Sequence, residues 1–179
     1  RFFLIFIFIA VSFSAKAQDK KTELITDRPD QTESSAVVPR KALQIETGFL
    51  MENKLVESFD QKSFAYNTTL FRYGLLDNFE LRLGLEYLGE KVSLNNTDAT
   101  GSFSGFSPIY AGFKVKIADE DALRPEIAFL GGLILPFTAN DYFKPDHSAA
   151  NIRFAISHTL SDRFSLGYNL GAEWDGETA

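Results

Sequence analysis

Few side chains in this sequence are placed where they could act in catalysis. A serine hydrolase needs a serine, a histidine and a carboxylate within hydrogen-bonding reach of one another. His147 lies between Asp146 and Ser148 in a long polar stretch, for which a solvated loop is the simpler interpretation. His158 follows Ser157 in a segment of alternating polarity, and neighbours on a strand point to opposite faces, so these two side chains cannot meet. We therefore expect that the protein is not an enzyme.

The sequence offers equally little for a metal or a cofactor. It has no cysteine and two histidines, and these lack the HExxH spacing of a zinc protease. Gly131 and Gly132 sit inside a predicted strand rather than in a phosphate-binding loop. The net charge of −6 argues against a nucleic-acid partner, since neutralising phosphates requires clustered Lys and Arg. The sequence predicts no metal, no cofactor and no nucleic acid.

The remaining charged residues alternate with apolar ones along short segments. In Phe79–Tyr87 the odd-numbered positions are apolar, and the even-numbered positions are charged or glycine. Phe164–Trp174 has the same period, with its apolar residues at even positions. A period of two predicts a β-strand with one apolar and one polar face.

Seven segments are predicted as strands on this basis: 43–51, 63–75, 79–87, 103–117, 126–136, 152–158 and 164–174. In 63–75 two apolar sets compete, and we favour the set of Phe71, Tyr73 and Leu75 because it leaves Arg72 on the polar face. The connections alternate between tight acidic turns and long polar stretches. The tight turns are 76–78, 118–122 and 161–162, and the long stretches are 52–62, 90–102 and 138–149. Such alternation is typical of outer-membrane barrels.

The predicted fold is therefore all-β, an antiparallel up-and-down transmembrane β-barrel over residues 41–179. The chain starts without Met and stops without a closing pattern, and seven is an odd number of strands. We expect the barrel to be incomplete at the C-terminus for these reasons. A soluble periplasmic β-barrel that binds a ligand remains an alternative.

In a membrane barrel the polar face lines the lumen. The predicted lumen-lining residues carry both signs of charge and have glycines between them: Glu46, Arg72, Glu80, Arg82, Glu86, Lys114, Lys116, Glu126, Arg153, Arg163 and Glu173. This mixture suits a hydrated conduit for small solutes, and it equally suits a salt-bridged interior that only holds the barrel together.

Aromatic residues near the strand ends predict a membrane girdle, with lipid as the partner: Tyr73, Phe79, Tyr87, Phe164 and Trp174. On the strands that begin at Phe79 and Phe164, the aromatic ends are separated by roughly 20 to 25 Å along the membrane normal, which fits the apolar band of such barrels. The alternative is that they cap a soluble core.

The N-terminus predicts export. Residues 2–13 are an unbroken apolar run, too short for a transmembrane helix of about 20 residues, and Ala15 and Ala17 fit a signal-peptidase site. We assign 1–17 to a signal peptide, with a membrane anchor as the alternative, and 18–40 to a polar leader. In the leader, Asp27, Arg28 and Asp30 could enter the lumen mouth and meet opposite charges, or could stay solvated in the periplasm.

The run from Leu24 to Ser35, which contains TDRPDQTES, and the following Leu43–Phe49 resemble the start of a family of Bacteroidota outer-membrane proteins. Similar segments occur at 67–75, 105–108 and 125–128. The family is described as "putative MetA-pathway of phenol degradation", and its members are often labelled transporters. The resemblance implies an outer-membrane barrel that takes up small, aromatic or hydrophobic compounds. It carries over no substrate residue.

We expect a passive outer-membrane transporter or channel for small molecules. A structural or lipid-modifying outer-membrane barrel is the alternative within the membrane.

Overall fold

The protein is described by a computed structural model over residues 24–27, 32–56, 59–94 and 99–176. The predicted signal peptide at 1–17 lies outside the described residues, as do Arg28 and Asp30 of the leader. Within the described part of the chain, no helix is long and apolar enough to cross a membrane.

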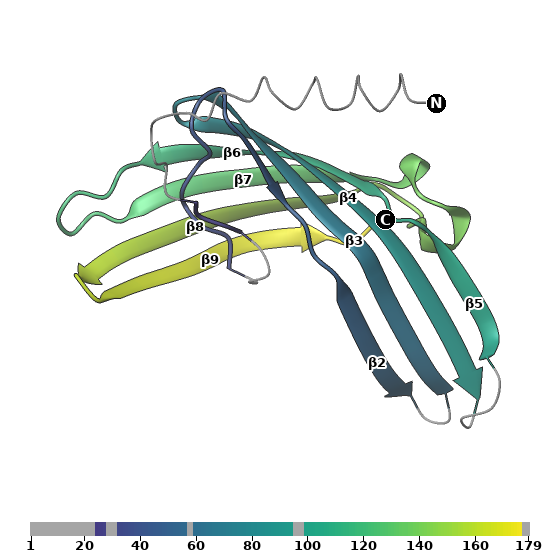
Figure 1. The fold of residues 1–179 in the computed structure, drawn as a ribbon. Coiled ribbons are helices and arrows are strands. Elements are labelled where there is room, and N and C mark those ends of the chain that lie inside the picture. The colour runs from purple at the N-terminus through teal and green to yellow at the C-terminus, as the bar shows by residue number, and fades with distance from the viewer. Residues whose placement is uncertain (1–23, 28–31, 57–58, 95–98, 177–179) are drawn as a thin grey trace, which may run out of the picture.

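One antiparallel sheet makes up the fold and curls into a half-barrel (Figure 1). Its strands are β1 (Leu43–Glu46), β2 (Leu50–Val56), β3 (Phe59–Leu76), β4 (Phe79–Leu94), β5 (Ala99–Phe106), β6 (Ile109–Ala118), β7 (Glu126–Leu135), β8 (Ala149–Ser161) and β9 (Phe164–Trp174). Two short 3-10 helices, η2 (Pro136–Thr138) and η3 (Asp141–Phe143), connect β7 to β8. The prediction of an all-β, antiparallel, up-and-down fold is confirmed.

Two of the predicted strands are each divided in two. The segment 43–51 forms β1 and β2, which both pair with β3, and the segment 103–117 lies within β5 and β6, which both pair with β4. Pro108 explains the second division, because proline has no N–H to donate to a strand ladder. Each of the seven predicted strands therefore corresponds to one strand in the hydrogen-bonded order β1-β3-β4-β6-β7-β8-β9.

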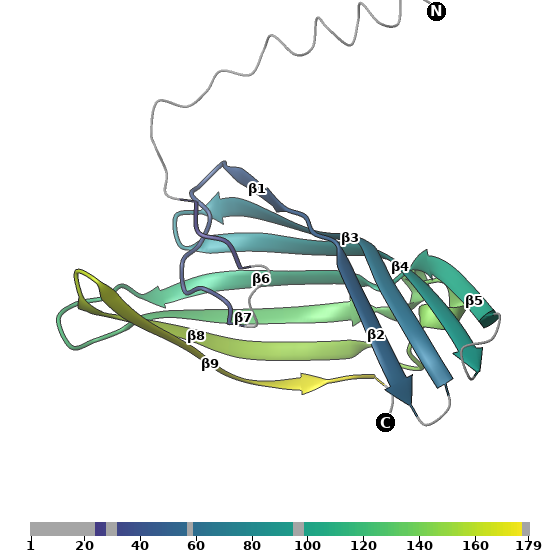
Figure 2. The same cartoon turned by 60° about the horizontal axis from the view of Figure 1, so that its bottom comes forward.

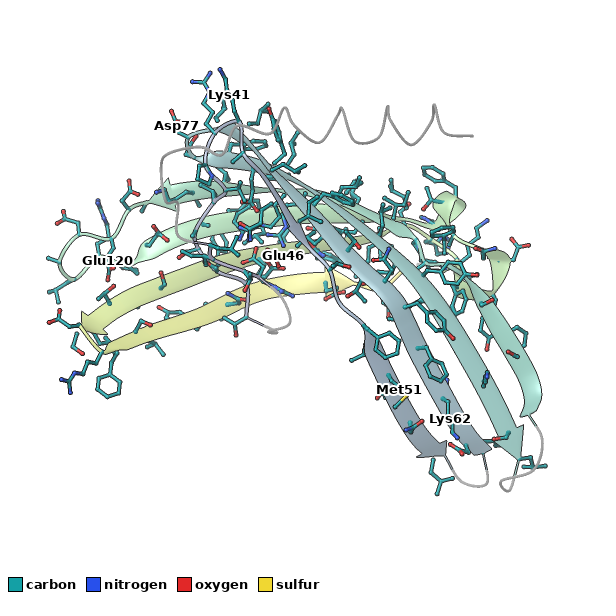
Figure 3. The ribbon with its side chains drawn as sticks, viewed as in Figure 1. Lys41, Glu46, Met51, Lys62, Asp77 and Glu120 are labelled. Atoms are coloured by element: carbon teal, nitrogen blue, oxygen red, sulfur yellow. The ribbon has the colours of Figure 1, made fainter. Side chains whose placement is uncertain are left out.

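The long polar connections predicted at 52–62 and 90–102 are wrong. β3 has 18 residues and β4 has 16, and both continue into these stretches, where Gln61 faces Val92 and Lys62 faces Lys91. Together with β2 and β5 they form an extension that bends away from the curled sheet (Figure 1). The ladder satisfies the backbone of this extension, so the charged residues that interrupt its apolar positions do not prevent a strand. Figure 3 shows Met51 and Lys62 in this extension, and Lys41 and Asp77 at the opposite end of β3.

A bulge explains the two competing apolar sets in the predicted strand 63–75. The register between β3 and β4 shifts between Ala65 and Asn67, which leaves Tyr66 without a partner. The alternation therefore reverses at this point. Beyond the bulge Arg72 is buried and Tyr73 is exposed, in agreement with the favoured choice.

Burial in this sheet is the reverse of that in a water-soluble protein. The largest fully buried side chains are Arg72, Lys114 and Glu80. Large apolar side chains lie on the opposite face, where Leu83 is 40% exposed and Phe154 is 43% exposed. Lys, Arg and Glu are almost never fully buried unless they are paired. The polar face must therefore be covered and compensated, and the residues of the leader do this.

Candidate functional site

The candidate site is the polar, concave face of the sheet. Alternation on β3, β4 and β6 turns Arg72, Arg82, Glu80 and Lys114 to this face, and the register places Arg72 opposite Arg82 and Glu80 opposite Lys114. Glu46 joins them from β1, where its neighbour Gln44 faces Arg72. The structure thus gathers five of the predicted lumen-lining residues into one buried group.

The described residues of the leader run across the curled sheet (Figure 2), and the carboxylate of Asp27 enters the group. One carboxylate oxygen of Asp27 is 2.7 Å from the Arg82 guanidinium, 2.7 Å from the Lys114 ammonium and 3.2 Å from the Arg72 guanidinium. Burial alone would raise the pKa of the Asp27 carboxyl, but Lys114, Arg82 and Arg72 hold it well below its ordinary value. Asp27 is the centre of a charge network that joins three strands.

Side chains on the concave face of the sheet also bind the backbone of the leader. The N–H of Val38 donates to Glu80 at 2.7 Å, and the N–H of Asp27 donates to Glu46 at 3.1 Å. Lys114 donates to the carbonyl of Ser34 at 2.8 Å. Since this part of the leader has no regular structure, these contacts supply the partners that its buried peptide groups need.

A second group of contacts carries the leader to the far strands. Glu33 lies 2.7 Å from Arg82, and its backbone exchanges hydrogen bonds of 2.7 and 3.0 Å with the amide of Asn169 on β9. The hydroxyl of Ser35 donates to Glu126 of β7 at 2.7 Å and lies 2.7 Å from the hydroxyl of Ser157 on β8. The leader therefore spans the concave face from β1 to β9.

Gly74 of β3 lets the leader approach the wall. A Cβ at this position would lie 2.1 Å from the carbonyl oxygen of Pro39 and 2.4 Å from that of Val38. Both contacts are with backbone, which cannot move aside as a flexible side chain can. A residue without a side chain is required here.

The other predicted lumen-lining residues lie outside this group. Lys116 pairs with Asp119 in the next turn and lies 3.9 Å from Glu126, while Arg163 and Glu173 are exposed. Glu86 and Arg153 line cavities instead. Asn169, Ser157 and Tyr110 also lie on the polar face, but they are neutral, and charge in the sequence does not point to them.

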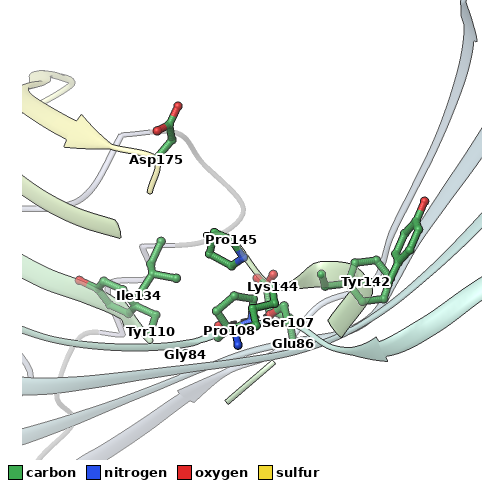
Figure 4. Close-up of a pocket in the computed structure, with 11 residues that line it drawn as sticks. Gly84, Glu86, Ser107, Pro108, Tyr110, Ile134, Tyr142, Lys144, Pro145 and Asp175 are labelled. Carbon is green, nitrogen blue, oxygen red and sulfur yellow. Dashed lines mark hydrogen bonds between the residues drawn. The ribbon is translucent and has the colours of Figure 1, made fainter. Parts of the chain in front are cut away.

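Two cavities lie beyond the leader along β4. The larger, of about 510 Å³, is lined by Glu86, Tyr110, Tyr142 and Lys144 among others (Figure 4). The smaller, of about 160 Å³, is lined by residues that include Arg82, Tyr110 and Arg153. Three residues of β4 mark the order of these features. Glu86 lines the larger cavity, Arg82 lines the smaller one, and Glu80 binds the backbone of the leader.

Tyr110 lines both cavities. It lies over a floor of glycines on adjacent strands, where a Cβ at Gly132 would be 2.2 Å from the tyrosine ring and one at Gly112 would be 2.4 Å from its hydroxyl oxygen. Any side chain at these positions would displace the ring.

The predicted girdle residues lie on or beside the exposed face. Phe164 is 70% exposed, Trp174 58% and Tyr73 39%. Phe79 stacks on Phe113 with ring centroids 5.7 Å apart, and the contacts continue to Phe129 and Phe154 across four strands. Tyr87 lies 6.2 Å from Tyr66 and 5.1 Å from Phe106, again between ring centroids.

The two histidines lie apart from the charge network. The ring of His158 stacks on Tyr168, whereas Ser157 points to the concave face and meets Ser35. The backbone N–H of His147 donates to Gly176 at 2.9 Å. Among the residues that the structure describes, no group of three or more His, Asp or Glu side chains could hold a metal ion.

Comparison with known proteins gives one match. No curated protein and no solved structure matches the chain. A family model described as "Putative MetA-pathway of phenol degradation" matches residues 26–179, which include the leader from residue 26 onwards and the whole sheet. The curled antiparallel sheet and this match agree with the family inferred from the TDRPDQTES run. The chain belongs to the family described as "Putative MetA-pathway of phenol degradation".

Proposed function

We propose that the protein is an outer-membrane β-barrel through whose polar interior small solutes pass passively, and that the leader constricts this interior. The observation that carries the proposal is the reversed burial of the sheet. Arg72, Glu80 and Lys114 are enclosed, while leucines and phenylalanines of the same strands are exposed.

A lipid environment accounts for this reversal. In water, apolar surface costs roughly 25 cal/mol per Å², and a sheet face covered by leucine and phenylalanine would favour association or aggregation. In a bilayer the same face is solvated by acyl chains, and closed barrels turn their polar residues inward. The predicted signal peptide supports export, the first step towards the outer membrane.

The interior has the features of a solute path. Two cavities follow each other along β4, and charged and hydroxyl groups line them. Beyond the smaller cavity, at Glu80, the leader covers the concave face. The leader is held by hydrogen bonds and ion pairs rather than by a strand ladder, so it can be released without breaking the sheet. The family description concerns phenol degradation, which makes small aromatic compounds the first solutes to test.

Liposome swelling with the full-length protein tests the proposal. Vesicles that contain the protein should swell in iso-osmotic solutions of small neutral solutes, including phenol-sized compounds, faster than empty vesicles. Failure of every small solute to permeate would contradict passive transport. Partition of the mature protein into detergent-free buffer would contradict the membrane location and favour a soluble binder.

A further inference from the structure

The smaller cavity has walls that are rich in hydrogen-bond donors. Arg82 of β4, Tyr110 of β6 and both Asn151 and Arg153 of β8 line it, together with Glu33 of the leader. Its apolar wall consists of Leu70 and Leu130, which are both buried. Its volume of about 160 Å³ corresponds to about five water molecules.

Arg82, which lines this cavity, has one unused hydrogen-bond donor. Its two terminal nitrogens bind Asp27, Glu33 and Glu80, but its Nε is buried and has no hydrogen-bond partner among the described residues. The residue itself is only 4% exposed. A buried, unpaired N–H is uncommon in native proteins and calls for an acceptor.

Arg153 brings an unused charge. It is half-buried, and within the described part of the chain it makes no hydrogen bond or ion pair. Neither the Tyr110 hydroxyl nor the Asn151 amide has a hydrogen-bond partner there. Tyr110 lies within electrostatic range of Arg82, Glu33 and Arg153, so these groups share one neighbourhood. Glu33 already pairs with Arg82 and does not neutralise Arg153.

We propose that this cavity binds a small carboxylate anion, with its charge facing Arg153 and Arg82 and its short chain against Leu70 and Leu130. Among the described residues, the unmet groups include the Arg82 Nε–H, the Arg153 charge and the donors of the Tyr110 hydroxyl and the Asn151 amide, which an anionic acceptor satisfies and a cation does not. Guanidinium groups also match the geometry of a carboxylate better than that of a spherical anion. This inference rests on the proposed function for the route by which the anion enters, past Tyr110 from the larger cavity.

Propionate is a suitable probe, because its number of non-hydrogen atoms fits the volume, and propionamide is its neutral counterpart. Binding to the full-length protein in detergent is measured by calorimetry and by ligand-observed NMR. We expect saturable binding of propionate and at least about 10-fold weaker binding of propionamide, a loss that corresponds to about 1.4 kcal/mol.

Variants locate the site. Arg153→Gln should weaken propionate binding at least about 10-fold, and Tyr110→Phe should weaken it less. Arg163→Gln removes the same charge from an exposed position outside the cavity and should bind as the unaltered protein does. Circular dichroism of each variant shows whether the sheet is retained.

Equal binding of propionate and propionamide, absence of saturable binding, or equal effects of Arg153→Gln and Arg163→Gln would each overturn the inference. Swelling assays with neutral solutes, run on the same preparations, separate the two proposals. Permeation without propionate binding contradicts only the anion site. Propionate binding without permeation contradicts only the proposed transport.

Discussion

The single carboxylate of Asp27 pairs with three buried cations of the interior. It meets Arg72, Arg82 and Lys114, which belong to strands far apart in sequence, and Lys114 lies 87 residues away. The spacing of charges along the chain indicates that such a pairing is possible, but it does not choose between a docked and a solvated leader. That choice depends on which strands become neighbours, so the sequence left both open.

Neutralising this carboxylate should release the leader. In Asp27→Asn three cations lose their shared partner while they remain buried, and removing one member of a buried pair costs about 3–5 kcal/mol. We expect faster protease cleavage within 24–40 and faster hydrogen exchange there. Asp77→Asn, in an exposed turn, is the matched control and should leave both rates unchanged. Equal protection in the two variants would contradict the central role of Asp27.

Acid should act through the same carboxyl. Because the pKa of Asp27 is lower in the docked leader than its ordinary value of 3.8, ionisation favours docking. This contribution is complete at neutral pH and is lost as the pH falls below about 3.8 towards the lower pKa of the docked state. Pepsin cleavage of the leader, measured across the acidic range, should rise steeply in the unaltered protein. In Asp27→Asn the rise should be smaller; an identical profile would assign the pH dependence to other carboxyls.

At the scale of the strands, polarity is a less reliable guide than alternation. Alternation identifies the seven strand positions along the path of the curled sheet, because apolar and polar residues lie on opposite faces of each strand there. The sequence predicts loops for the extended ends of β3 and β4, since Asp60, Lys62, Glu90 and Lys91 interrupt their apolar residues. In the structure, backbone pairing between the two strands continues through these residues. Of the three long connections that the sequence predicts, the one at 138–149 is outside the strands over nearly all its length, and it contains η3.

At Gly74 the backbone of the leader lies directly against strand β3. In Gly74→Ala the new Cβ would collide with the Pro39 and Val38 carbonyls, so the leader must move away from β3. We expect greater protease sensitivity of the leader and, if the leader constricts the path, faster swelling of liposomes. Gly167→Ala is the control, because nothing lies within 4 Å of a Cβ at that glycine. Normal protection of the leader in Gly74→Ala would contradict this prediction, because it would mean that β3 moves to accommodate the new Cβ while the leader stays in place.

At the scale of the whole molecule, the half-barrel has an apolar outside and a charged inside. Arginine on the outside should therefore be costly only in a bilayer. Leu83→Arg lies on the central strand β4 and should lower the free energy of unfolding in phospholipid vesicles by about 2–4 kcal/mol. Leu123→Arg, at a 95% exposed turn position, should change it by less than about 1 kcal/mol. Equal stabilities of the two variants would argue that the outer face is not in contact with lipid.

The contact between Glu33 and Asn169 has a consequence for the order of folding. These residues are 136 positions apart, yet the leader precedes every strand of the sheet. Loop closure over such a distance is slow, and the leader cannot reach its final position before β9 has joined β8. The contacts of Glu33 therefore form only after β9 has paired with β8, and in a pulse-labelling experiment the backbone N–H of Glu33 should become protected no earlier than the amides of β9.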